Sequence, residues 1–389
     1  MSVTFPEGFI WGTATAAHQV EGGNWNNDWW EWEHTSDRVR EPSGDACDQY
    51  NRYEEDLDLL AGFGFNSYRF SIEWARIEPE DGEFSRVALD HYRRVCAACH
   101  ERGITPIVTF HHFTSPRWVA ARGGWAEAGT AELFGRYVTR ATSHLGDLIG
   151  RACTINEPSM VATGGYLSGV FPPGKRDREA RYRANATFID AHHRAVEAIR
   201  SGPGDAPVGI CLAMSDYQAV DGGDAYLDRI RTGMEDVFLD ALDGDDFVGV
   251  QCYSRTRVGP SGALRPEPGV ELTQMGYEFW PESLEATIRR AYDRSGGVPV
   301  VVTENGIGTD DDTRRIEYTR QALQGIRRCL NDGIDVLGYV HWTLLDNFEW
   351  AEGYRPTFGL VGVDRKTFER RPKPSASWLG HIARAGTMD

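Results

Sequence analysis

The sequence lacks any long apolar run: stretches such as Val298–Val302 are far shorter than the ~20 residues of a membrane-spanning helix. It also lacks a basic segment, because 58 acidic and 41 basic residues are spread along the chain and leave a net charge of −17. An acidic chain without a Lys/Arg block is a poor partner for nucleic acid or an anionic membrane surface. The segment MSVTFPEGFIWG has neither a basic region nor a sustained apolar stretch, so we expect no secretory signal.

The cysteines show neither a disulfide framework nor a zinc site. There are seven, and Cys96 and Cys99 form the single C-x-x-C motif, without a second pair or a nearby histidine. Together with Leu89 and Tyr92 they repeat at helical spacing, which predicts two thiols on a buried helix face. We therefore expect a reduced, cytoplasmic protein.

No linker rich in Pro, Gly, Ser or like charges divides the chain, so residues 1–389 are expected to form a single domain. Two stretches, 22–46 and 254–277, are rich in Gly, Pro and polar residues and are expected to be loops. Elsewhere, short apolar runs alternate with amphipathic patterns. The runs expected to be strands are Phe9–Thr15, Ser67–Ser71, Thr105–His111, Ala152–Ile155, Val208–Ala213, Phe247–Val250, Val298–Thr303 and Val336–His341.

Apolar stripes at helical spacing lie between these runs. They are Tyr50/Tyr53/Leu57/Leu60, the stripe from Leu89, Leu133/Tyr137/Ala141/Leu145, Tyr182/Ala186/Ile189/Val196, Leu284/Ile288/Ala291 and Ile316/Leu323/Ile326/Leu330. Gly103 and Gly333 each follow a stripe and are expected to end a helix. Eight strands alternating with helices predict an α/β fold, a single (β/α)8 TIM barrel. Units of about 49 residues exceed the ~30 of a bare barrel and predict long βα loops. A doubly wound sheet would normally carry a G-x-G-x-x-G turn, which GTATAAHQ is not.

Two glutamates each follow a predicted strand. Glu157 follows Ala152–Ile155 in the segment TINEP, and Glu304 follows Val298–Thr303 in VTENG. Either one alone is typical of a surface carboxylate or a helix cap. In a parallel barrel, however, the carboxyl ends of all strands meet at one mouth, so we expect both side chains in one cleft. Glycoside cleavage requires such a pair, one to protonate the leaving oxygen and one to attack or stabilise the anomeric carbon.

The sequence resembles glycoside hydrolase family 1, the retaining β-glucosidase type, over nearly its full length. N-E-P alone occurs in other barrel glycosidases, but the order and spacing of the matching segments are specific. These segments are FIWGTATAAHQVEG at 9–22, SYRFSIEWARIEP at 67–79, TFHHFTSPRW at 109–118, TINEP at 154–158, VTENG at 302–306 and HWTLLDNFEWAEGYRPTFGL at 341–360. The resemblance implies a retaining exo-β-glycosidase, with β-glucosidase as the first expectation and β-galactosidase or β-fucosidase as alternatives.

The resemblance also implies roles for residues at the mouth. Glu157 matches the general acid/base and Glu304 the nucleophile. Arg69 matches the arginine that keeps the nucleophile ionised, although a structural ion pair would give the same pattern. Tyr253 matches the tyrosine that orients the nucleophile, and Asn156 the donor to the sugar 2-hydroxyl.

Other matching residues are implied to bind the non-reducing sugar. Gln19, His112, Glu349 and Trp350 match those that bind its hydroxyls, and Trp342 matches the platform beneath the ring. Relatives that act on 6-phosphosugars replace the Glu-Trp pair with small residues, so we expect an unphosphorylated sugar. The resemblance implies no cofactor or metal, and we expect Asp310–Asp312 to be a solvated loop.

One segment departs from the family: Gln251-Cys252-Tyr253 stands where its members commonly have N-Y-Y. Cys252 is smaller than the tyrosine common in the family, and the chain is shorter than most family members, so its loops should be short. We therefore expect a wide mouth on the leaving-group side that makes few contacts with the aglycone and is lined in part by this thiol. Two further hypotheses remain. An inactive sugar-binding barrel would lack one glutamate, and a thioglycosidase can lack the acid, yet both glutamates are present. The sequence leaves the aglycone, the oligomeric state and the balance between hydrolysis and transglycosylation open.

Overall fold

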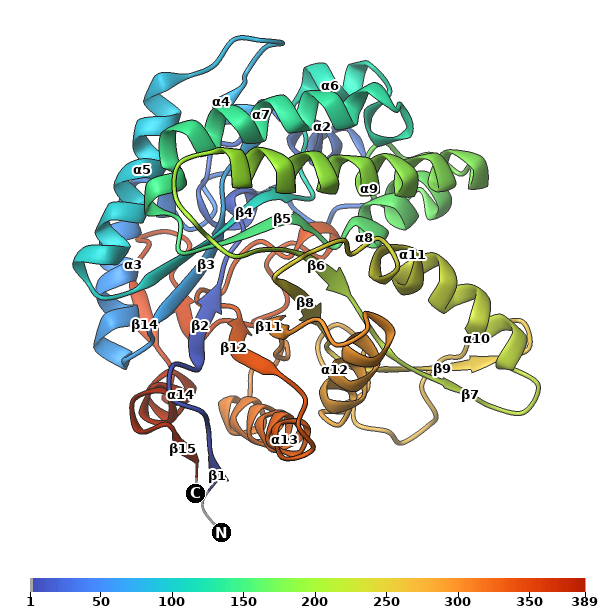
Figure 1. Cartoon of the computed structure of the whole chain (residues 1–389). Coiled ribbons are helices and arrows are strands. Elements are labelled where there is room, and N and C mark those ends of the chain that lie inside the picture. Colours follow the sequence, from blue (N-terminus) through green and yellow to red (C-terminus); the bar gives the residue numbers. More distant parts are fainter. Residues whose placement is uncertain (1–2, 389) are drawn as a thin grey trace.

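A computed structural model describes residues 3–388 of the chain. Eight parallel strands close into a barrel in the order β11-β12-β2-β3-β4-β5-β6-β8, with helices packed around it (Figure 1). This arrangement confirms the predicted TIM barrel. The barrel strands are β2 (Ile10–Ala14), β3 (Ser67–Ser71), β4 (Thr105–His112), β5 (Arg151–Asn156), β6 (Val208–Ala213), β8 (Phe247–Gln251), β11 (Val300–Glu304) and β12 (Val336–Trp342).

The predicted strands match the barrel strands closely because these segments are largely buried on both faces, and most of them contain a short apolar run that stands out from the flanking sequence. The predicted bounds of β3 and β6 coincide with the observed ones. β11 begins two residues later than predicted, after Pro299, which has no N–H to donate to a neighbouring strand.

Helices follow the strands and cover the outside of the barrel. They are α3 (Gln49–Phe63), α5 (Arg86–Glu101), α7 (Gly129–Leu145), α9 (Arg178–Ser201), α10 (Asp224–Arg231) with α11 (Val237–Leu239), α12 (Ser283–Arg294), α13 (Asp312–Asn331) and α14 (Pro374–Ala385). Cys96 and Cys99 are fully buried on α5, as predicted. Gly103 and Gly333 have φ of 68° and 82°, which suits their predicted places after helices.

The predicted stripe of α9 is only partly right. Val196 is buried and Ile189 packs half-buried against the core, but the other two residues do not pack there. Tyr182 and Ala186 are exposed, whereas Ala184, Phe188 and Ala191 are buried. The buried face includes four alanines and several polar residues, and α9 packs closely against α7. Small and polar side chains give a weak apolar signal, so the larger Tyr182 was included in the stripe although it is exposed.

The two predicted loops contain regular structure. The stretch 22–46 includes α2 (Asp28–Thr35), which begins where the Asn27 side chain accepts a hydrogen bond from the N–H of Trp30. The stretch 254–277 includes β9 (Arg255–Gly259) and β10 (Gly262–Ala263). With β7 (Asp216–Ala219) they form a three-stranded sheet that, together with α10, extends to one side of the barrel (Figure 1).

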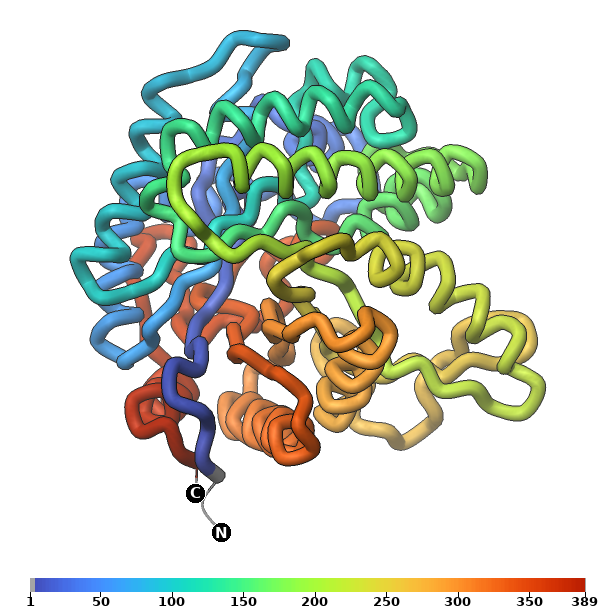
Figure 2. The backbone as a smooth tube through the Cα atoms, viewed as in Figure 1, coloured from blue at the N-terminus to red at the C-terminus, as the bar shows by residue number. Residues whose placement is uncertain are grey.

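The ends of the described chain lie side by side (Figure 2), because β1 (Val3–Thr4) pairs antiparallel with β15 (Thr387–Met388). Another small sheet joins β13 (Val361–Val363) to β14 (Arg370–Pro372). Within residues 3–388, no helix is both long and apolar enough to cross a membrane. Short helical segments in the loops include α1 (Ala17–Val20), α4 (Trp74–Ile77), α6 (Arg117–Ala121), α8 (Pro158–Ala162), η3 (Thr163–Ser168) and η4 (Thr232–Asp236).

Candidate active site

A cavity of about 500 Å³ opens where the carboxyl ends of the barrel strands meet. Eight of the ten predicted site residues line it: His112, Asn156, Glu157, Tyr253, Glu304, Trp342, Glu349 and Trp350. The other two, Arg69 and Gln19, are fully buried behind the wall and reach the lining residues through hydrogen bonds. Seven separate segments of the chain thus bring all ten residues to one place.

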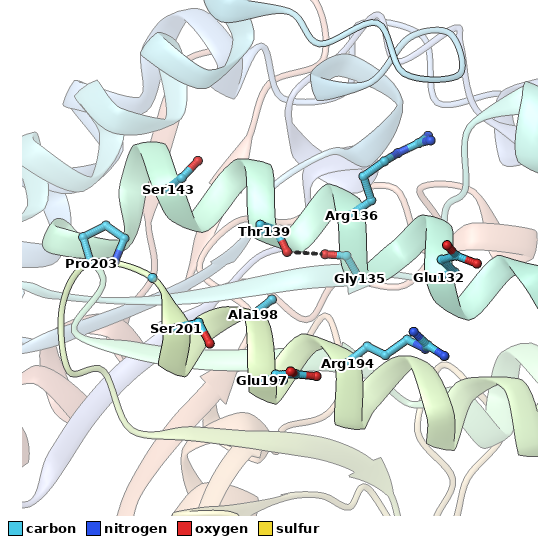
Figure 3. Close-up of a pocket in the computed structure, with 11 residues that line it drawn as sticks. Glu132, Gly135, Arg136, Thr139, Ser143, Arg194, Glu197, Ala198, Ser201 and Pro203 are labelled. Atoms are coloured by element: carbon cyan, nitrogen blue, oxygen red, sulfur yellow. Dashed lines mark hydrogen bonds between the residues drawn. The ribbon is translucent and has the colours of Figure 1, made fainter.

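A second hollow of about 510 Å³ lies between α7 and α9 on the outside of the barrel (Figure 3). Size therefore does not single out a site, but chemistry does. Two arginines of this hollow already have carboxylate partners, Arg136 with Asp81 (2.6 Å) and Arg194 with Asp190 (3.0 Å). None of the predicted site residues lies there, so the barrel cavity is the candidate active site.

Glu304 ends β11 and has both carboxylate oxygens bound by donors. Arg69 on β3 donates from Nη1 to Oε1 at 2.6 Å, and the Tyr253 hydroxyl donates to Oε2 at 2.6 Å. Burial raises the pKa of Glu304 above its ordinary value, and Arg69 and Tyr253 offset part of that rise. Donors on both oxygens and an adjacent guanidinium favour the ionised carboxylate.

Glu157 lies directly after β5, and its surroundings favour the protonated carboxylic acid, in contrast to those of Glu304. Burial, and then the negative charge of Glu304, raise its pKa well above the ordinary value; Glu349 adds to the rise and Arg69 opposes it. Glu304 therefore ionises first and helps Glu157 to retain its proton. The Glu157 backbone is left-handed, with φ of 45°, and its N–H donates to Cys211 O at 2.8 Å.

Such backbone conformations gather at this cavity. Phe113, Glu157 and Trp350 line it, and they are three of the six non-glycine residues with positive φ in the described chain. A non-glycine residue with a left-handed backbone carries strain of ~1–3 kcal/mol, and this conformation persists only where the surrounding structure enforces it. The cavity wall thus holds side chains in orientations that a relaxed backbone would not give.

Asn156 is oriented by two donors. Its Oδ1 accepts from Arg69 Nη2 at 2.6 Å and from Gln251 Nε2 at 2.8 Å. Because arginine can only donate, the atom facing it must be the amide oxygen, and Nδ2 is left beside His112 Nε2 at 3.2 Å. Gln251 is a site residue that sequence reasoning did not select; its position two residues before Tyr253 was the available signal.

The opposite part of the cavity combines aromatic rings with hydrogen-bonding groups. The His112 ring lies nearly parallel to the rings of Trp342 and Trp350, with centroid distances of 5.7 and 6.2 Å. Gln19 Nε2 donates to Glu349 Oε2 at 3.4 Å. Burial, followed by the charge of Glu304, raises the pKa of Glu349 to about 8.

Four polar atoms of the site residues are buried without a hydrogen-bond partner in residues 3–388. They are Gln19 Oε1, Arg69 Nε, His112 Nδ1 and Gln251 Oε1. Buried polar atoms are normally satisfied, so orphaned atoms beside an open cavity indicate partners supplied by a ligand or by water. Flat apolar rings next to such atoms are suited to a sugar, which has apolar faces and a hydroxyl-bearing edge.

Comparison with known proteins decides the family. The family model described as glycosyl hydrolase family 1 matches residues 1–240 and 250–388. The chain belongs to glycosyl hydrolase family 1.

Similar family members are known from curated sequences and solved structures. Beta-glucosidase A of Thermotoga maritima is 33% identical, with 99% of each chain covered. A bifunctional beta-D-glucosidase/beta-D-fucosidase of Bifidobacterium breve is 34% identical over 97% of this chain and 98% of its own. The structure of a beta-glycosidase from Pyrococcus horikoshii has a TM-score of 0.94 at 34% identity, covering 100% of this chain and 97% of that one. The Thermotoga maritima beta-glucosidase in complex with glucoimidazole has a TM-score of 0.93 at 31% identity, covering 98% and 99%.

The family segment that contains Glu304 depends on its neighbours for its shape. Asn305 Nδ2 donates to Cys252 O at 2.7 Å and so ties the end of β11 to the end of β8. Gly306 then passes β12 so closely that a Cβ atom would lie 2.3 Å from Trp342 O. The sequence Glu-Asn-Gly is therefore a local requirement for placing Glu304.

The expectation that Cys252 lines the mouth is wrong. Its side chain is fully buried and does not reach the cavity. Burial raises the pKa of its thiol to about 11, and the hydroxyls of Ser283 and Thr287 on α12 lie close enough to lower it. Cys252 follows the last inward-facing residue of β8, so its side chain turns outward, toward the helix layer.

The acidic segment Asp310–Asp312 is only partly solvated. Asp310 and Asp311 are exposed, and the Asp311 side chain caps α13. Asp312 instead begins that helix and accepts from the N–H of Ser375 at 2.7 Å. Across residues 3–388, no group of three or more His, Cys, Asp or Glu side chains is arranged to hold a metal ion.

Proposed function

We propose that this family member is a retaining exo-β-glycosidase that hydrolyses terminal β-D-glucosyl residues, with residues 1–389 acting as one catalytic domain. The contrast between two carboxyl groups in one cavity carries the proposal. Arg69 and Tyr253 bind both oxygens of Glu304, whereas burial and the neighbouring charge keep Glu157 protonated. An ionised carboxylate and a carboxylic acid are the nucleophile and the acid of this reaction.

The first step forms a glycosyl-enzyme. A carboxylate oxygen of Glu304 bonds to the anomeric carbon as the bond to the leaving oxygen breaks, and Glu157 gives its proton to that oxygen. Asn156 Nδ2, oriented by Arg69 and Gln251, would donate to the 2-hydroxyl of the sugar. Trp342 would support the apolar face of the ring.

The second step releases the sugar. Formation of the ester removes the negative charge of Glu304, so the pKa of Glu157 falls and its carboxylate can accept a proton from water. The water oxygen bonds to the anomeric carbon from the side that the leaving group vacated, and Glu304 leaves as carboxylate. Two inversions give net retention.

A 2-deoxy-2-fluoro-β-D-glucoside with an activated leaving group tests this proposal. The fluorine slows both steps, but the activated leaving group keeps the first step faster than the second. The protein mass should rise by one fluoroglucosyl group, and the modified peptide should contain Glu304. Labelling of another carboxyl group, or an inverted anomer as the first product of an ordinary substrate, would refute the proposed roles.

The sugar specificity has a second candidate, because the Bifidobacterium breve relative is named for both glucosidase and fucosidase activity. Glu349 and Gln19 are proposed to bind the hydroxyls farthest from the scissile bond. Fucose lacks the 6-hydroxyl, so it would make fewer contacts there. We expect the aryl β-glucoside to have the highest kcat/KM in a panel of aryl β-glycosides that includes the galactoside and fucoside.

Removing the Tyr253 hydroxyl should slow the reaction without loss of fold. In Tyr253→Phe, Glu304 loses one charge-assisted hydrogen bond of 2.6 Å. Such bonds contribute ~1.5–3 kcal/mol, so kcat for an aryl β-glucoside should fall roughly 10- to 100-fold. Thermal unfolding provides the control, and an unchanged kcat would show that Tyr253 does not assist Glu304.

A 6-phospho-β-glucoside should be cleaved far more slowly than its unphosphorylated counterpart. The charge of Glu349 is only part of the reason, because its pKa of about 8 leaves much of it neutral at pH 7. The larger reason is that Arg255 is the only Lys or Arg side chain lining the described cavity, and Glu278 already pairs with it. Burial of a phosphate dianion without a cation is costly. Comparison of kcat/KM for the two aryl substrates tests this, and discrimination should increase above pH 8.

We also propose a reducing, cytoplasmic setting, since all seven cysteines are buried free thiols. Fractionation of cells that express the chain, with activity measured in each fraction, tests the location. Activity mainly outside the cytoplasm would contradict it.

A further inference from the structure

Four of the six methionines in the chain line the cavity: Met160, Met214, Met234 and Met275. They come from four separate places, namely α8, the residue after β6, η4 and the loop beyond β10. The only methionines elsewhere are Met1 and Met388. Their convergence is a property of the folded site and could not be seen as a sequence motif.

The methionines lie on the side of the cavity where the leaving group must be. They follow β5, β6 and β8, whereas the proposed sugar-binding residues Gln19, Trp342 and Glu349 follow β2 and β12. In the barrel order, β5 lies across from β12 and β6 across from β2. Glu157 also follows β5, and the group that protonates the leaving oxygen must face the aglycone.

Most of the serine, threonine and arginine groups on this side already have partners. The Ser215 hydroxyl bonds to that of Thr256 at 2.8 Å, and the Ser254 hydroxyl donates to Glu278 O at 2.7 Å. Arg255 donates to Glu278 Oε2 at 2.7 Å, and its guanidinium lies 3.7 Å from the centre of the Trp280 ring. Within residues 3–388, the buried site atoms without a partner belong to Gln19, Arg69, His112 and Gln251, and of these only Gln251 ends a strand that a methionine follows without also contributing to the sugar-binding set. A second sugar would therefore find few free partners on the methionine side beyond Gln251 Oε1 and the hydroxyls of Tyr217 and Tyr277.

Apolar side chains complete this wall. Phe171, Val170 and the rings of Tyr217 and Tyr277 line the cavity beside the methionines. Met234 is held in place, since Thr163 Oγ1 donates to its sulfur at 3.2 Å. Methionine is unbranched and polarizable, so it adapts to irregular apolar ligands and makes favourable contacts with aromatic rings.

We propose that the leaving-group side is a methionine-lined site that selects extended apolar aglycones, alkyl or aryl, over a second sugar. This inference rests on the proposed function and gives it a substrate class. It also replaces the expectation of a weakly contacting mouth, which was drawn from Cys252 and from the shortness of the chain. Each methylene group that the methionines remove from water should raise kcat/KM by a factor of about four.

A series of n-alkyl β-D-glucosides tests the proposal, because methyl, butyl and octyl glucosides all release a primary alcohol of the same kind. With each substrate kept below its micelle concentration, kcat/KM should rise with chain length. The octyl glucoside should exceed the methyl glucoside by at least about tenfold and should also exceed cellobiose. Equal values along the series, or a preference for cellobiose, would overturn the proposal.

Variants at Met234 connect the preference to the wall. Met234→Gln keeps the length of the side chain but makes its end polar, and should lower the octyl-to-methyl ratio several-fold, whereas Met234→Leu should retain most of it. Met275→Gln, on a half-buried loop position, repeats the test if Met234→Gln folds poorly. Met388→Leu, in β15 away from the cavity, is the matched control and should keep the wild-type ratio. An unchanged ratio in both Gln variants would overturn the proposal.

Failure of this proposal can be distinguished from failure of the proposed function. If the fluoroglucoside labels Glu304 but kcat/KM does not change along the alkyl series, the glycosidase roles stand and the methionine site is wrong. If no label forms and no β-glycoside is cleaved, the proposed function itself is wrong.

Discussion

Replacing Glu304 with alanine should lower kcat/KM for an aryl β-glucoside by about 10⁵-fold, the scale expected when a covalent nucleophile is lost. The variant also leaves the fully buried Arg69 without its 2.6 Å partner. An unpaired buried charge destabilises a fold by ~3–5 kcal/mol, so thermal unfolding must be measured beside activity. Glu304→Gln keeps an acceptor for Arg69 and should be equally inactive with a smaller loss of stability.

Azide distinguishes a lost nucleophile from a damaged site. In Glu304→Ala, azide can enter the space left by the carboxylate and attack the anomeric carbon from the same side, giving an α-glucosyl azide. Asp310→Asn, in an exposed position on the same loop, is the control and should retain wild-type activity. A β-configured azide product, or high activity without added azide, would contradict the role of Glu304.

The sequence predicted those parts of the fold that depend on local apolar pattern. The barrel strands are buried on both faces, so runs such as Val208–Ala213 stand out from their surroundings. The stretch 22–46 was different, because α2 depends on the Asn27 cap and on only two buried side chains, Trp29 and Glu33. Neither feature produces a clear helical stripe among glycines and polar residues.

The candidate site also has a part that the sequence could predict and a part that it could not. Glu157 and Glu304 could be predicted because strand ends in a barrel meet at one mouth, and the family resemblance supplied their partners. The orienting bond from Gln251 to Asn156 could not, because it joins residues 95 positions apart. The error at Cys252 has a related cause: whether a residue at a strand end faces the cavity or the helix layer depends on the strand's rotation, which composition does not reveal.

Replacing Glu157 with alanine should affect substrates according to their leaving groups. Methyl β-glucoside and cellobiose release poor leaving groups and need a proton, so their kcat/KM should fall ~10²–10⁴-fold, the usual contribution of a general acid. A 2,4-dinitrophenyl β-glucoside releases a stable anion and should keep most of its kcat/KM. Azide should now give a β-glucosyl azide, because the space beside the leaving group is open while Glu304 still forms the intermediate. Equal losses for both classes of substrate would contradict the acid role.

The pH dependence of kcat/KM gives a second test of Glu157. Its pKa is raised by burial and by Glu304, and only its protonated form can donate, so the wild-type value should fall as pH rises through that pKa. Glu349, with a pKa of about 8, ionises in a neighbouring range and could produce a similar fall. The dinitrophenyl substrate separates the two carboxyl groups, since Glu157→Ala cleaves it without an acid. If Glu157 is the source, the fall at high pH should disappear in that variant; if the fall persists, it belongs to Glu349 and the assignment to Glu157 is wrong.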